Sequence, residues 1–165
     1  MPPKVAAAIP RSVPIEIKIP AINVDAKIIP VGTDSSGALE TPPLSGPQAD
    51  DAAWWDGGAT PGQDGPSIIV GHIDSAAEGP LVFWNLHELV PGEAVEVILA
   101  DGAEVWFNVV GSQQVGKTDF PTQQVYGPTP WPTLRLITCT GDFDPQTGHY
   151  DDNLIVYLDE SAPSG

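Results

Sequence analysis

The chain consists of short apolar runs separated by polar segments that are rich in proline and glycine. Residues 15–19 alternate strictly between apolar and polar side chains, which is typical of a half-buried strand. Residues 67–70 end in a continuous β-branched run, which is typical of a buried strand. Asp101-Gly102 separates two further runs and predicts a hairpin turn. The other strands are predicted over 26–31, 38–40, 94–99, 104–110, 133–138 and 154–158.

Helices are predicted to be short, with one helical turn over 80–86 and another over 122–126. A long irregular connection is predicted over 41–66, around Trp54-Trp55, and at least one of these large side chains should be mostly buried. About eight short strands without a long helix or a repeat predict an all-β closed barrel or sandwich. We expect a lead-in or tether over 1–13, one domain over 14–160 and a tail over 161–165.

Composition narrows the choice of partners. The net charge of −16 repels phosphates and anionic lipid headgroups, so no nucleic acid partner is expected. The single cysteine excludes an internal disulfide and a cysteine-cluster zinc site. No phosphate-binding loop, HExxH or EF-hand pattern occurs, so we expect no cofactor and no metal. No run approaches the roughly 20 apolar residues that a membrane span needs.

The candidate chemistry lies at the ends of two predicted strands. Cys139 ends the run 133–138 and is followed by a glycine turn, and His72 ends the run 67–70. One cysteine and one histidine in such places indicate a thiol nucleophile with an imidazole partner. A lone cysteine in an apolar run is otherwise more often an inert core residue. His87 and His149 are expected to be surface residues.

Arg135 is one of two arginines in the chain, and the other lies in the lead-in. Alternation along a strand puts Arg135, Ile137 and Cys139 on one face. Arg135 is therefore either part of the floor of a groove beside the cysteine or a surface arginine on an edge strand.

These residues resemble those of the sortases, the cysteine transpeptidases of Gram-positive cell surfaces. Leu136-Ile137-Thr138-Cys139 is similar to the last four positions of the family signature TLxTC, and Val70-Gly71-His72 to its histidine strand. The resemblance runs from about residue 14 to residue 158. Four further segments of the sequence are most like the actinobacterial class F group: 19–24, Pro42-Pro43-Leu44, 71–75 and 141–153.

One departure stands out. Sortases generally carry an arginine on the last strand, about a dozen residues after the cysteine, where it holds the substrate and stabilises the oxyanion. This chain has Asp151 and Asp152 there, and it has Arg135 where the signature begins with threonine. We hypothesise that Arg135 takes over the role of the missing arginine.

The resemblance implies an all-β fold, an eight-stranded sortase-type barrel with short helical turns. It implies cleavage of an LPxTG-like sorting signal at the Thr–Gly bond through a thioacyl-enzyme, followed by transfer to an amine acceptor at the cell wall. The expected catalytic residues are Cys139, His72 and Arg135. The expected substrate-binding residues are Ile137, Thr138 and Trp55.

The implied partners are surface proteins that carry the sorting signal and a peptidoglycan-type amine, and the protein is expected to be a monomer. It is expected outside the cytoplasm, anchored to the cell membrane by a segment that is not among these 165 residues. The alternative is a degenerate, non-catalytic barrel that binds sorting-signal peptides. A cysteine L,D-transpeptidase fits less well, because no Ser-x-Gly-Cys follows a His-Gly pair.

Overall fold

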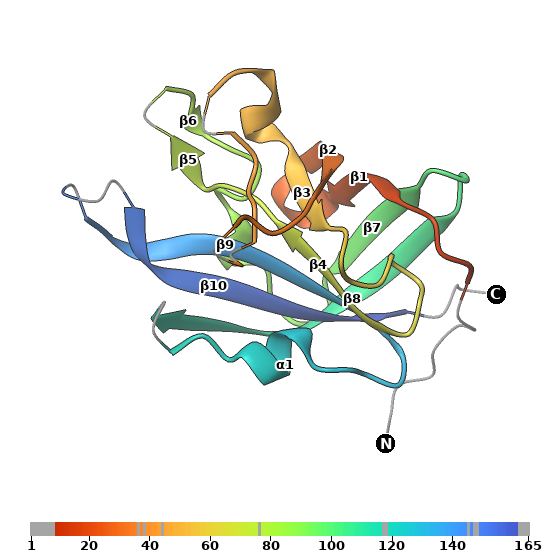
Figure 1. Ribbon diagram of the computed structural model, residues 1–165. Helices are drawn as coiled ribbons and strands as arrows, with labels where there is room; N and C mark the ends of the chain where they lie inside the picture. Colours follow the sequence, from red (N-terminus) through yellow and green to blue (C-terminus); the bar gives the residue numbers. More distant parts are fainter. Residues whose placement is uncertain are drawn as a thin grey trace.

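The computed structural model describes residues 9–35, 37, 39–43, 45–75, 77–116, 119–144, 146 and 149–161, and it leaves out the side chains of 139–144 and 149–151. Eight strands close into a barrel in the order β1-β2-β3-β4-β9-β10-β8-β7 (Figure 1). The barrel strands are β1 (Pro14–Ile19), β2 (Val24–Val31), β3 (Ala52–Trp55), β4 (Gly65–Val70), β7 (Ala94–Leu99), β8 (Glu104–Gly116), β9 (Pro132–Asp144) and β10 (His149–Glu160). The predicted eight-stranded barrel is therefore confirmed.

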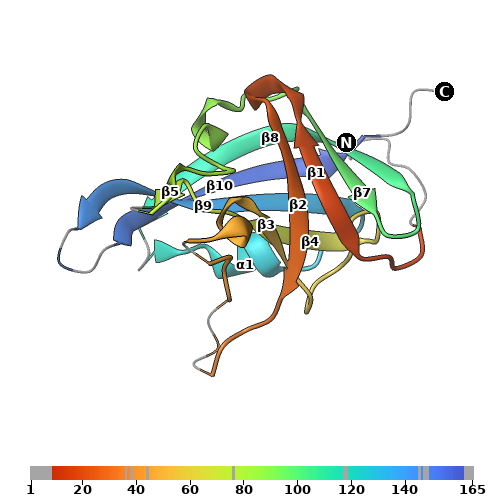
Figure 2. The same cartoon turned by 90° about the horizontal axis from the view of Figure 1, so that it is seen from above.

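Two smaller features complete the fold. The strands β5 (Asp74–Ser75) and β6 (Gly79–Pro80) form a separate two-stranded sheet. This hairpin lies at the same end of the barrel as the β9–β10 hairpin (Figures 1 and 2). The helical segments are all short: η1 (Pro20–Ile22), η2 (Pro47–Asp50), η3 (Leu86–Glu88) and α1 (Thr122–Tyr126).

The barrel interior holds the main apolar core. Alternate residues of each strand point inward, so Leu134 and Leu136 on β9 meet Leu154 and Val156 on β10 and Ile69 on β4. Trp54, Phe83 and Phe107 are among the largest fully buried side chains of this part of the chain. The prediction that at least one tryptophan of the 54–55 pair is buried is confirmed by Trp54, whose exposed fraction is 1%.

A second apolar cluster covers the outer face of β3, β4, β9 and β10. Val125 from α1 packs there with Ile68, Val70, Ile137 and Ile155. The helix thus shields part of the outer face, and the rest of that face carries the candidate site. Outward-pointing positions of β4 and β9 are accordingly apolar next to α1.

The described part of the lead-in is bound to the barrel. The backbone N–H of Ile9 donates to the carbonyl oxygen of Gly62 at 3.1 Å, and the Ile9 side chain packs on the core. Arg11 donates to the carbonyl oxygens of Gly58 at 2.9 Å and Asp56 at 3.1 Å. Residues 9–11 therefore contact the barrel, and the bounds of the lead-in stay a prediction.

Several predicted elements agree with the structure. The hairpin at Asp101-Gly102 joins β7 and β8, and the helix predicted over 122–126 is α1. The turn predicted over 80–86 is a series of turns that runs into η3.

Other expectations were wrong. The strand predicted over 38–40 is only an isolated bridge between Thr33 and Leu39, and Ala38 lies outside the described residues. The connection 41–66 is interrupted by η2 and by the strand β3. No strand was predicted between 138 and 154, but the extensions of β9 and β10 occupy most of this segment.

Among the described residues, the helices are too short and too polar for any of them to span a membrane.

Candidate active site

The register between β4 and β9 aligns the two predicted catalytic residues. These strands are parallel, and each residue from Gly65 to Val70 faces the residue 67 positions later on β9. The backbone N–H of Gly71 still bonds to the carbonyl oxygen of Ile137 at 3.1 Å, so the two chains stay together beyond the last pair. If this register continues for two more residues, His72 lies level with Cys139.

The side chain of Cys139 lies outside the described residues, so its predicted distance to the His72 ring is not tested. The backbone of Cys139 is described as part of β9. Along the β9 backbone, position 139 follows Arg135 and Ile137 in steps of two. Position 72 follows Val70, the last residue of β4, by two residues.

The His72 ring is half-buried and has one defined partner. Its Nε2 lies 2.6 Å from the carbonyl oxygen of Pro42. A carbonyl only accepts hydrogen bonds, so Nε2 carries a proton and donates it. The second nitrogen, Nδ1, is then the acceptor of a neutral imidazole and can take up a proton.

A close-packed turn holds the backbone on both sides of this ring. The N–H of Phe83 donates to the carbonyl oxygen of His72 at 3.0 Å, and the N–H of Leu81 donates to that of Ile73 at 2.7 Å. A Cβ atom at Gly71 would lie 2.7 Å from the Phe83 ring and 2.8 Å from Val82. Glycine is needed at position 71 because these two side chains occupy the space.

The predicted substrate-binding residues lie on different faces. Ile137 belongs to the outer cluster, as does Trp55, whose ring packs edge-on against Tyr126 of α1 at a centroid distance of 5.4 Å. Thr138 follows the inward series of Leu134 and Leu136; it is buried, and its hydroxyl has no partner among the described residues. The contact of all three with a substrate stays a prediction.

Arg135 lies on the outer face, four residues before Cys139, which is roughly 13 Å along an extended strand. Its guanidinium stacks on the ring of Tyr157 at 4.8 Å and donates to the carbonyl oxygen of Leu134 at 3.4 Å. Burial lowers the pKa of this guanidinium, and Tyr157 and Asp159 partly offset that effect. The described contacts of Arg135 are therefore made at the level of Tyr157, and its catalytic role stays a prediction.

Sequence reasoning did not single out Asn153. On β10 it is the direct cross-strand partner of Cys139, and the next pairs are Ile155 with Ile137 and Tyr157 with Arg135. Directly opposed residues have Cβ atoms roughly 4.5–5.5 Å apart. Asn153 shares the outer-face alternation of Ile155, is half-buried, and makes no side-chain hydrogen bond to the described residues. Its alternation with the run 154–158 was the only signal in the sequence.

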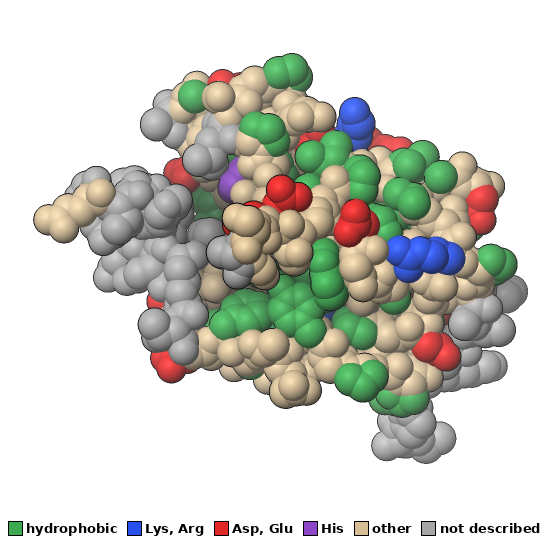
Figure 3. All heavy atoms as spheres, viewed as in Figure 1, with side chains coloured by type: hydrophobic (Ala, Val, Ile, Leu, Met, Phe, Trp, Pro, Cys, Tyr) green, Lys and Arg blue, Asp and Glu red, His purple; other side chains and the backbone are tan. Residues whose placement is uncertain are grey.

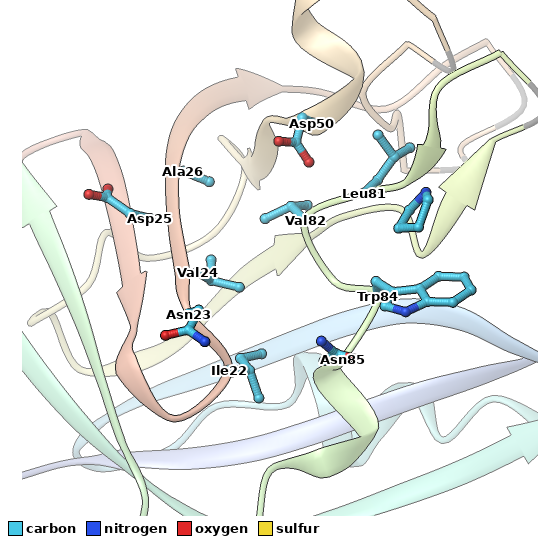
Figure 4. A pocket seen from close by; sticks show the side chains of 11 residues that line it. Ile22, Asn23, Val24, Asp25, Ala26, Asp50, Leu81, Val82, Trp84 and Asn85 are labelled. Atoms are coloured by element: carbon cyan, nitrogen blue, oxygen red, sulfur yellow. The ribbon is translucent and has the colours of Figure 1, made fainter.

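A cavity of about 260 Å³ lies beside the turn that holds His72, between the start of β2 and residues 80–85. Figure 4 shows the carboxylate of Asp50 at its upper edge, that of Asp25 at the left and the Trp84 ring at the right. The Trp84 side chain beside this cavity is half-exposed. On the face shown in Figure 3, Lys and Arg side chains are sparse, in keeping with the net charge of −16.

Among the described residues, no three His, Cys, Asp or Glu side chains gather in a way that can hold a metal ion. His87 is exposed on η3, and the side chains of His149 and Asp151 lie outside the described residues. The site is thus defined by His72 together with the backbones of β9 and β10.

Comparison with known proteins identifies the family of this chain. The family model described as the sortase domain matches residues 17–161. The chain belongs to the sortase family. This makes it a member of a transpeptidase family built on a β-barrel. No curated protein matches it.

Solved sortases share the fold. A lid mutant of sortase A from Corynebacterium diphtheriae has a TM-score of 0.67 at 23% identity, over 93% of this chain and 72% of that chain. Sortase C-1 from Actinomyces oris has a TM-score of 0.65 at 22% identity, over 89% and 72%. Sortase C1 from Streptococcus agalactiae, in its complex with MTSET, has a TM-score of 0.68 at 16% identity, over 96% and 72%. These are A- and C-type sortases, so the resemblance to class F stays a prediction.

Proposed function

We propose that this sortase is a cysteine transpeptidase that cleaves an LPxTG-like sorting signal at the Thr–Gly bond and transfers the acyl group to an amine acceptor at the cell wall. The observation that carries the proposal is the β4–β9 register, which aligns His72 with Cys139 when it is continued by two residues. Thiol attack with imidazole proton transfer needs these two groups on the same face of neighbouring strands.

In the proposed reaction, Nδ1 of His72 takes the proton of the Cys139 thiol, and the thiolate attacks the threonine carbonyl carbon and forms a tetrahedral oxyanion. The C–N bond then breaks, and His72 protonates the leaving glycine amine. The thioacyl-enzyme is resolved when His72 takes a proton from the incoming amine, which attacks the thioester and releases the thiolate. The Pro42 carbonyl supports this proton transfer because it holds the Nε2–H and leaves Nδ1 to exchange the proton.

The oxyanion needs a donor besides backbone amides, and the last-strand arginine is absent from this sequence. We propose that the carboxamide of Asn153, opposite Cys139, supplies it. Arg135 remains the other candidate, as the sequence suggests, although its described contacts are with Tyr157 and Leu134. Ile137 and Trp55 are proposed to contact the substrate from the outer cluster.

The proposed location is outside the cytoplasm, at the cell membrane, which fits an enzyme that acts on surface proteins and a peptidoglycan-type amine. The strongly negative charge is compatible with an exported protein.

The decisive experiment is mass spectrometry after incubation with an LPxTG peptide. A thioacyl adduct on Cys139, or a cleaved peptide that accumulates with an added amine, supports the transpeptidase. Cys139→Ala should abolish both products and keep the thermal midpoint. Intact peptide with measurable binding would instead support a non-catalytic peptide-binding barrel.

A further inference from the structure

A cavity of about 500 Å³ opens on the outer face of the barrel, away from the cavity of Figure 4. Its walls come from four elements, with Gln124 on α1, Ser112 and Gln113 on β8, Arg135 on β9, and Tyr157 and Asp159 on β10. A volume of this size falls within the range of roughly 300–1,000 Å³ that is usual for ligand sites. It therefore has room for more than a bare ion.

The cation on the cavity wall is poorly satisfied by the protein. Arg135 is only 7% exposed, and its Nε–H has no acceptor among the described residues. Of its five donors, the described structure fills one, with the 3.4 Å bond to the carbonyl oxygen of Leu134. Leaving buried donors unfilled is costly, and a ligand that accepts from them would recover that cost.

The guanidinium of Arg135 also lacks an ion-pair partner among the described residues. Asp159 lines the same cavity, but its Oδ1 accepts a hydrogen bond from the Trp131 indole at 3.1 Å, and no ion pair within 4.0 Å joins it to Arg135 in the described structure. The Tyr157 ring faces the guanidinium, and its hydroxyl donates to Oε1 of Gln113 at 3.0 Å. The neutral side chains beside the guanidinium add further donors: the amides of Gln113 and Gln124 and the hydroxyl of Ser112.

We infer that this cavity binds the carboxylate of a small organic ligand or peptide side chain, with Arg135 as its cation. A carboxylate matches the planar fork of a guanidinium, which can bind both of its oxygens. A single negative charge also fits better than the two charges of phosphate, because one cation must balance the ligand beside Asp159 in a protein of net charge −16. The inference can be tested apart from the proposed transpeptidase reaction, because its test reads binding and not turnover.

The test is a titration followed by NMR of the arginine Nε–H groups. The chain has two arginines, so two signals are expected, and Arg11→Gln assigns them by removing the other one. The probes are acetate, a blocked tripeptide with a central glutamate, its glutamine counterpart and inorganic phosphate. We expect acetate and the glutamate peptide to shift the Arg135 signal saturably, and the glutamine peptide to leave it in place.

Two cavity variants test the assignment by thermal shift with the same probes. Arg135→Gln removes the cation, and Gln113→Glu keeps an acceptor for the Tyr157 hydroxyl but adds a competing carboxylate to the wall. Each should weaken carboxylate binding about tenfold or more. Arg11 contacts Gly58 and Asp56 instead, so Arg11→Gln should leave carboxylate binding unchanged. Circular dichroism checks that both variants fold, and Gln113→Glu keeps the test valid if Arg135→Gln does not.

Each outcome of these titrations either supports or overturns the carboxylate site. Binding of acetate alone supports the site and assigns it to free small carboxylates, whereas tighter binding of the glutamate peptide assigns it to acidic side chains. Absence of a saturable shift at tens of millimolar carboxylate would overturn the inference. So would phosphate that binds as tightly as carboxylate, or carboxylate binding that Gln113→Glu leaves unchanged.

Discussion

The Nε2 atom of His72 lies 2.6 Å from the carbonyl oxygen of Pro42. This contact joins a residue at the end of β4 to the segment before η2, and it fixes which ring nitrogen carries the proton. In hydrolases with a catalytic triad, a carboxylate has this orienting role, and in the proposed mechanism the Pro42 carbonyl would take it. The proposed proton exchange therefore runs through Nδ1, and an imidazolium that forms during the reaction keeps its partner.

The first prediction concerns His72 itself. His72→Ala removes the group that protonates the leaving amine, so the rate of peptide cleavage should fall by roughly 10²–10⁴. The matched control is His87→Ala, which removes an exposed histidine from η3 and should leave the rate unchanged. Steady-state kinetics with an LPxTG peptide measures both. Equal losses in the two variants would contradict the assignment.

The second prediction compares the two candidate oxyanion donors. Asn153 is the direct cross-strand partner of Cys139, so Asn153→Ala should lower the rate of thioacyl formation by about 10²–10³. Asn153→Arg should retain the rate, because it adds a charged donor at the same place. Asn108→Ala, on the exposed side of β8, serves as the control.

The sequence-based hypothesis makes Arg135 the oxyanion donor in place of Asn153. In that case Arg135→Ala lowers the catalytic efficiency by about 10² or more, and Lys restores only part of it, because an ammonium lacks the planar fork. Rapid-quench measurement of the thioacyl-enzyme in both alanine variants separates the two donors. A normal acylation rate in Asn153→Ala would refute its proposed role.

The third prediction concerns Gly71, which is packed against Val82 and Phe83. A methyl group there would lie within 3.0 Å of both side chains, so Gly71→Ala should destabilise the protein by about 1–3 kcal/mol and displace His72. Chemical denaturation measures the first effect, and peptide cleavage measures the second. In the control Gly111→Ala, the added Cβ meets nothing within 4 Å, and little loss of stability is expected. Similar stability in both variants would show that the turn is more adaptable than its packing indicates.

The barrel could be predicted from the sequence where the pattern is local. The buried run of β4, the hairpin at Asp101-Gly102 and the short helix α1 all follow from neighbouring residues. The strand β3 escaped prediction because it has four residues among prolines and glycines, and it is held by parallel pairing with the distant β2. Pairing with a remote strand leaves little trace in local sequence.

The site could be predicted only in part for the same reason. His72 stood out because a glycine and an apolar run precede it, and family resemblance strengthened that choice. Asn153 did not, since its importance depends on the register between β9 and β10, which contains a bulge between Tyr150 and Asp152. The long extensions of these strands are polar, so their sequence suggested a loop where the backbone continues to pair.

The last prediction concerns pH and Glu160, the final residue of β10. Its side chain is 5% exposed, and burial, with a smaller contribution from Asp64, raises its pKa from 4.5 to about 7. A carboxyl with a raised pKa holds its proton more tightly in the folded than in the unfolded chain. The folded protein therefore loses stability as the pH rises from 4.5 to about 7. Below pH 4.5, the protonated Glu160 carboxyl makes its full contribution to the free energy of unfolding.

Glu160→Gln removes this titration and keeps a similar shape. At pH 8 we expect the variant to be more stable than the wild type by about 1–3 kcal/mol, and at pH 4 the two should be nearly equal. Urea denaturation across this pH range measures the difference, with Glu104→Gln on the exposed start of β8 as the control. A constant difference at all pH values would mean that Glu160 affects packing and not proton uptake. A difference that grows as the pH rises toward 7 would identify Glu160 as a buried acid that destabilises the barrel once it ionises.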